Sequence, residues 1–134
     1  MEAANEGAAL VDPDASGRNI GIRVHLPFEQ EVNAFVGEAY EHRTFFSRLH
    51  HFVLVSDAFV VVPGGIGTVL ELAMIWQLLQ ARKLNRTPLI LIGRMWADFV
   101  SSGREYLLRA EFPLASPQVL AIPRCVNRQR RPLR

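Results

Sequence analysis

The chain has 134 residues, 49% hydrophobic and 21% charged, with a formal net charge of +2, which is an ordinary composition for one globular domain. No apolar run reaches the roughly 18–20 residues that a membrane-spanning helix needs, and the first ten residues carry no basic residue of the kind that opens a secretory signal. The single Cys125 excludes an internal disulfide and a thiolate zinc site, and the four histidines lack metal-ligand spacing. We therefore predict a cytoplasmic protein that does not interact with a membrane and has no metal site.

The first part of the chain alternates between helical and extended patterns. Ala and Glu favour a helix over residues 2–10, and a strand is predicted over 19–25. Residues 27–42 are polar with little periodicity and are predicted to form a loop. An amphipathic helix is predicted over 43–55. Five large apolar side chains make its stripe: Phe45, Phe46, Leu49, Phe52 and Val53.

The second part continues the alternation. Residues 57–62 are apolar and β-branched, which is typical of a buried parallel strand, and an apolar helix is predicted over 69–79. A third strand over 88–93 and a helix over 95–110 follow. The residues predicted for the buried side of that helix are Trp96, Phe99, Tyr106 and Leu107. A loop at 111–118 and a fourth strand at 119–122 are predicted after the helix. The order predicts an α/β fold, a parallel sheet with helices on both faces.

The most informative segment is the glycine-rich turn between the strand at 57–62 and the helix that follows. Three glycines allow close backbone approach to a ligand, and a helix N-terminus offers unpaired N–H groups and partial positive charge. The turn is therefore predicted to bind phosphate through Gly64, Gly65, Gly67 and Thr68, with Glu71 beside it. The order matches neither the dinucleotide fingerprint nor the P-loop, and many such turns bind nothing. The helix dipole alone also favours an acid near this position.

Basic residues crowd the C-terminus. The predicted organisation is a nucleotide-binding domain over 1–123 and a basic tail over 124–134. We expect a solvated tail rather than a nucleic-acid site, because no aromatic residue is interleaved there to stack on bases. The arginines are Arg124, Arg128, Arg130, Arg131 and Arg134.

Several segments together resemble the LOG ("lonely guy") family of Rossmann-like proteins, long described as possible lysine decarboxylases. Arg48 stands fifteen positions before Pro63, where that family carries its catalytic arginine. Weaker matches lie at 1–8, at 26–33 and at 56–59, so the resemblance runs from Met1 to about residue 123. The family motif PGGxGTxxE is matched at Pro63, Gly64, Gly65, Gly67, Thr68 and Glu71.

The resemblance implies a phosphoribohydrolase that needs no cofactor. Such an enzyme hydrolyses the N-glycosidic bond of a nucleoside 5′-monophosphate to the free base and ribose 5-phosphate. Arg48 and Glu71 would be its catalytic residues, and the glycine turn would hold the substrate phosphate. A carboxylate suits the oxocarbenium-like transition state of this reaction, and a planar guanidinium can hold the phosphate or the leaving base.

Departures from the family pattern keep other hypotheses open. Leu49 and Leu70 replace a usual Lys and a frequent second acid, and the chain begins inside the family's first glycine-rich motif, so we expect an N-terminally truncated fold. The alternatives are a carrier for a nucleotide or a molybdopterin-type cofactor, and an inactive fragment. On its residues alone, Arg48 is interpreted as a surface arginine whose stem covers apolar surface. Lysine decarboxylation is disfavoured because the only lysine, Lys83, lies beyond the helix that follows the turn.

The helix predicted over 69–79 also indicates self-association. Only Glu71 and Gln77 interrupt its apolar surface, so nearly every side of it needs cover. The resemblance suggests a homodimer of this kind. Met74, Ile75 and Trp76 are the predicted core or interface residues.

Overall fold

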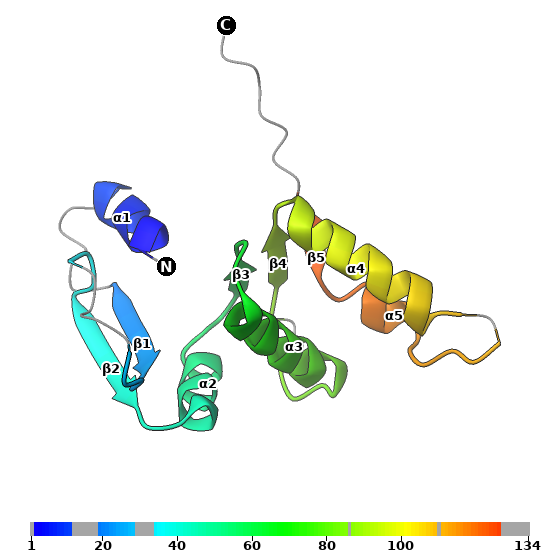
Figure 1. The fold of residues 1–134 in the computed structure, drawn as a ribbon, viewed down its shortest axis with the longest axis horizontal. Helices are drawn as coiled ribbons and strands as arrows, with labels where there is room; N and C mark the ends of the chain where they lie inside the picture. The colour runs from blue at the N-terminus through cyan, green and yellow to red at the C-terminus, as the bar shows by residue number, and fades with distance from the viewer. Residues whose placement is uncertain (1, 12–18, 29–33, 86, 110, 127–134) are drawn as a thin grey trace, which may run out of the picture. The chain divides into compact units, whose positions relative to one another are not determined.

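The structure is a computed structural model that describes residues 2–11, 19–28, 34–85, 87–109 and 111–126 (Figure 1). The chain divides into two compact units, Met1–Val55 (unit 1) and Ser56–Arg134 (unit 2), and each is described by itself. Both units combine helices with parallel strands, so the prediction of an α/β, Rossmann-like fold is confirmed. None of the helices in the described ranges is long and apolar enough to cross a bilayer.

Unit 1 is built on one pair of parallel strands. Its elements are α1 (Glu2–Val11), β1 (Ile20–Val24), β2 (Glu38–His42) and α2 (Phe45–Leu54). In the ladder, Ile20 lies opposite Glu38 and Val24 opposite His42. The prediction of a loop throughout 27–42 is therefore wrong for β2. Its sequence, EAYEH, shows no apolar alternation, and pairing with the β1 backbone holds it extended.

Helix α2 has a well-defined start but a thinly covered apolar face. Thr44 is its N-cap, and the Thr44 side chain accepts a hydrogen bond from the Ser47 N–H at 3.1 Å. Of the predicted stripe only Leu49 is buried, at 3% exposure, whereas Phe46 is 80% exposed. The stripe prediction is thus wrong for Phe45 and Phe46, because a two-stranded sheet and one short helix cannot cover a full helix face.

Unit 2 is a three-stranded parallel sheet with strand order β3-β4-β5. Crossovers between neighbouring parallel strands are right-handed in nearly all proteins, and this rule puts the two crossover helices on the same face of the sheet. The buried side chains of the sheet on that side include Phe59, Val61 and Leu91, and Val60, which points to the other face, is 58% exposed. The elements are β3 (Phe59–Val61), α3 (Ile66–Gln80), β4 (Leu89–Ile92), α4 (Arg94–Leu107), α5 (Pro117–Leu120) and β5 (Arg124–Val126).

Two predictions near the C-terminus are corrected. Residues 117–120 form the short helix α5, with Pro117 suited to a first helical position, and the last strand comes later, at Arg124–Val126. The strand predicted over 119–122 is therefore wrong, and the first three residues of the predicted tail pair with β4. The predicted loop at 12–17, the remaining tail at 127–134 and the motif positions 29, 30 and 33 lie outside the described residues.

The buried side of α4 also differs from the prediction. Trp96 is fully buried as predicted, but Phe99, Tyr106 and Leu107 are 45%, 57% and 37% exposed. Val100, one turn after Trp96, is buried instead. The core-facing side of α4 follows the i, i+4 spacing from Trp96, whereas the prediction selected aromatic residues by type.

Candidate functional site

The glycine turn joins the carboxyl end of β3 to the start of α3. Gly65 is the N-cap in extended backbone, and its carbonyl accepts from the N–H groups of Thr68 at 3.1 Å and Val69 at 3.2 Å. Helix α3 therefore begins at Ile66, three residues before the predicted start. The N–H groups of Ile66 and Gly67, in the first turn of the helix, have no carbonyl acceptor within the helix. No side chain caps this end of α3. The turn thus presents backbone donors of the type that bind anions.

The three glycines of the turn have different structural roles. A Cβ on Gly64 would lie 2.9 Å from the Thr68 Cβ and closer still to the Thr68 hydroxyl oxygen. Gly64 therefore makes room for the Thr68 side chain. A Cβ on Gly65 or Gly67 would meet no described atom within 4 Å. Open space lies over these two positions, and a ligand can approach the backbone there.

Glu71 is partly buried and lies one turn into α3. It follows Gly67 by four residues and Thr68 by three, so all three share one side of the helix. The next positions toward the core are filled by Leu72 and Ile75, which are buried. The structure therefore brings the predicted turn residues and the Glu71 carboxylate to the same end of α3.

Arg48 belongs to unit 1 and is tied to its backbone. The Arg48 Nε donates a hydrogen bond to the Ile22 carbonyl of β1 at 2.9 Å, and the residue is partly buried. It is thus anchored between α2 and β1, which differs from a surface arginine that only covers apolar surface. Arg48 lies in unit 1 and the turn in unit 2, so the structure describes the two sites separately.

A polar cluster that the sequence did not predict lies on the β1–β2 pair. The Glu41 carboxylate accepts from the Arg23 guanidinium at 2.5 Å and lies 3.2 Å from the His25 Nδ1. The cluster was missed because Glu41 fell within the predicted loop. Register is the signal that finds it, since Arg23 and Glu41 are direct cross-strand partners.

Two further polar contacts involve side chains of β2. The His42 Nε2 and His51 Nδ1 lie 2.9 Å apart, so one ring donates and the other accepts. The Tyr40 hydroxyl donates to the Glu38 carboxylate, and this hydrogen bond raises the pKa of Tyr40 above 10.0. In the described part of the chain, no three His, Cys, Asp or Glu side chains gather in a group that could hold a metal ion.

A comparison with known protein families shows to which family the chain belongs. Residues 1–107 match the model of the family described as "possible lysine decarboxylase". The chain belongs to this family, the LOG family. The match confirms the resemblance read from the glycine turn, and it ends at the last residue of α4. No curated protein matches the chain.

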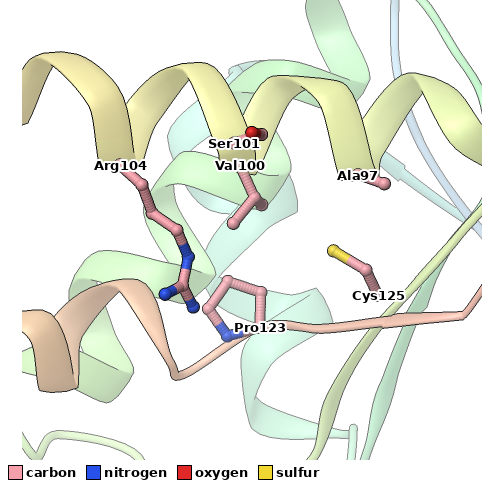
Figure 2. Close-up of a pocket in the computed structure, with 6 residues that line it drawn as sticks. All are labelled: Ala97, Val100, Ser101, Arg104, Pro123 and Cys125. Carbon is pink, nitrogen blue, oxygen red and sulfur yellow. The ribbon is translucent and has the colours of Figure 1, made fainter.

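Residues of α4, Pro123 and Cys125 of β5 line an open cavity of about 340 Å³ (Figure 2). Val100 and Arg104 project from α4 toward Pro123, and Cys125 comes from β5. The Arg104 Nη2 donates to the Leu120 carbonyl at 2.9 Å, and the Cys125 thiol lies 4.0 Å from the Trp96 carbonyl. The guanidinium therefore holds α5 against α4, a structural role.

Proposed function

We propose that this LOG-family chain hydrolyses the N-glycosidic bond of a nucleoside 5′-monophosphate, releasing the free base and ribose 5-phosphate. One observation carries the proposal: a glycine turn with uncapped backbone donors and open space over Gly65 and Gly67 stands at a parallel strand's carboxyl end, with Glu71 one turn behind it. A turn that only holds phosphate gains nothing from a carboxylate near its anion, so Glu71 favours catalysis over simple binding.

In the proposed mechanism, the turn anchors the substrate and Glu71 acts on the sugar. The amides of Gly64, Gly65, Gly67 and Thr68, with the Thr68 hydroxyl, hold the 5′-phosphate and so fix the ribose. Positioning of this kind can contribute about 7–11 kcal/mol to lowering a barrier. The Glu71 carboxylate stabilises the positive charge that develops on the ribose as the bond to the base breaks, or activates the attacking water.

Arg48 is proposed as the second catalytic residue, on the strength of its spacing from Pro63 in the sequence. Its guanidinium would hold the phosphate or the departing base. The hydrogen bond from Nε to the Ile22 carbonyl would orient the planar group for this task. The same bond is also what a purely structural arginine would make, so activity and stability must be measured together.

Lysine decarboxylation, which the family description names, has little support in this chain. A Schiff base requires a lysine at the reacting centre. Lys83, the only lysine of the sequence, lies beyond the C-terminal end of α3, in the turn that closes on the Leu78 carbonyl. A 15-residue helix is about 22 Å long, so a whole helix separates Lys83 from the glycine turn.

The proposal is tested by assaying ribose 5-phosphate release from a panel of nucleoside 5′-monophosphates. Glu71→Gln should lower turnover by about 10²-fold or more while leaving much of the binding intact. Glu105→Gln on the exposed side of α4 is the matched control and should keep wild-type turnover. Unphosphorylated nucleosides should bind much more weakly than the monophosphates.

A binding protein without catalysis is the second candidate, and the structural bond of Arg48 to β1 favours it. In that case Glu71→Gln would bind nucleotide as the wild type does, and neither protein would release ribose 5-phosphate. Near wild-type turnover in Glu71→Gln would instead reject the catalytic role of Glu71. Arg48→Ala completes the test, because loss of thermal stability with unchanged turnover would make Arg48 a structural residue.

We also propose that the chain forms a homodimer through α3. Ile75 is 2% exposed, and the Trp76 Nε1 donates to the Val119 carbonyl at 2.8 Å, so these predicted residues serve unit 2 itself. The exposed apolar positions on α3 are Ile66 at 85% and Leu70 at 47%. They are the better candidates for an interface with a second copy.

A further inference from the structure

We propose that unit 1 carries a binding site for a small organic oxyanion at the carboxyl ends of β1 and β2. A cavity of about 370 Å³ lies there, lined by His25, Glu41 and Arg43. His25 is the first residue after β1 and Arg43 the first after β2. Because the strands are parallel, both residues come to the same edge, the edge at which open α/β sheets bind ligands.

The charges around this cavity favour an anion. The Glu41 carboxylate is already occupied by the Arg23 guanidinium at 2.5 Å and the His25 ring at 3.2 Å. Among the residues that the structure describes, none pairs with Arg43. Among these described groups, two guanidinium groups against one carboxylate leave one positive charge in excess. The planar fork of Arg43 suits the two oxygens of a phosphate or a carboxylate.

The backbone holds the cluster in place. Arg23 and Glu41 are cross-strand partners in the register, and the His25 N–H donates to the His42 carbonyl at 2.8 Å, which extends the ladder beyond β1. The ladder therefore fixes the backbone from which these side chains extend, which reduces the ordering that a ligand must impose.

The size of the cavity indicates what accompanies the oxyanion. Ligand sites are typically about 300–1,000 Å³, and this one lies near the lower limit. A metabolite of a few carbon atoms that carries an oxyanion group therefore suits the cavity. That group comes from a phosphate ester or from a carboxylic acid, and both present the same oxygens to Arg43.

The test is an NMR titration of the full chain that follows the His25 imidazole signals. Inorganic phosphate and succinate are added separately at constant ionic strength, and the signals are assigned with His25→Gln. We expect a saturable shift with at least one anion. Arg43→Gln should weaken that binding by about tenfold or more, because a charge-assisted contact is lost. Arg94→Gln, which removes an exposed arginine paired with Asp98 on α4, is the control and should bind as the wild type does.

The outcomes separate this site from the glycine turn. Tighter binding of phosphate or of succinate supports the proposal and identifies which oxyanion is preferred. The absence of saturation with both anions overturns it, as does an unchanged titration in Arg43→Gln. Gly65→Val should leave the His25 titration intact, and loss of the shift in that variant would assign the anion to the turn and overturn the proposal. Failure of the hydrolase assay leaves all these expectations unchanged.

Discussion

The two units of this chain differ in how far their apolar side chains are buried. Unit 2 contributes nine of the eleven buried hydrophobic side chains in the described residues, and unit 1 contributes only Val24 and Leu49. Helix α2 of unit 1 has a clear apolar stripe, yet Phe46 is 80% exposed. Helix α3 of unit 2 has almost no amphipathic pattern, yet Leu72 is 1% exposed. Burial therefore follows the presence of a packed second layer, which a helical pattern alone does not supply.

The units also differ in how they present polar groups at the carboxyl ends of their strands. In unit 2 the donors are backbone N–H groups of a glycine turn, which no side-chain substitution elsewhere can remove. In unit 1 they belong to side chains such as Arg43 and His25 on a short parallel pair. Donors that belong to the backbone persist when side chains around the glycines change. Donors that belong to side chains are lost when one charged residue is substituted.

The largest expected effect tests the core of unit 2. Ile75→Asp buries an unpaired carboxylate at a 2%-exposed position and should destabilise the protein by about 4 kcal/mol or more. Leu70→Asp, on the same helix but 47% exposed, is the control and should change stability by less than about 1 kcal/mol. Urea denaturation measures both, and a stable Ile75→Asp would refute the packing of α3.

The Leu70→Asp variant also tests self-association. Light scattering at micromolar concentration should show a defined dimer for the wild type and a weakened one for Leu70→Asp. A clean wild-type monomer would reject the proposed homodimer without affecting the packing of Ile75.

The second effect compares the two units directly. Leu72→Ala and Leu49→Ala each remove a buried leucine, and such changes cost about 2–5 kcal/mol. Leu72 should fall in the upper half of that range because its dense surroundings cannot collapse into the gap, and Leu49 in the lower half. Hydrogen exchange should show Leu49→Ala loosening β1, β2 and α2 while β3 and β4 keep their protection. A larger loss from Leu49→Ala would show unit 1 to be the better packed.

The third effect separates the glycines of the turn. Gly64→Ala forces a Cβ against the Thr68 side chain and should cost about 1–3 kcal/mol. Gly65→Ala meets open space and should cost less than about 1 kcal/mol, as a poorer N-cap, while weakening nucleoside monophosphate binding. Thermal unfolding and calorimetric binding measure the pair. Equal destabilisation by both would contradict the geometry of the turn.

The smallest effect concerns the start of α2 in unit 1. Thr44→Ala removes the cap to the Ser47 N–H and should destabilise the protein by about 1 kcal/mol. Thr44→Ser keeps the hydroxyl and should stay close to the wild type. If the two variants are equally unstable, the methyl group of Thr44 rather than its cap is what matters.

The strand, glycine turn and helix around the site were predictable from sequence because their signals are local. The β-branched residues before Pro63 and the three glycines after it define the junction, and the structure places β3 and α3 on either side of it. Strand β2 was not predictable, because EAYEH has no alternation of its own. Nor were α5 and β5, since the backbone of Arg124–Val126 is extended by pairing with β4.

The sequence by itself determined the α/β class, the glycine turn between strand and helix, and the family, because their signals lie in consecutive residues. Only the tertiary structure decided which apolar faces are covered, that Arg48 holds the Ile22 carbonyl, and that Arg23, His25 and Glu41 meet beside Arg43. These contacts join residues far apart in the chain. Strand register and packing bring such residues together, and neither is visible in the local pattern of a single sequence.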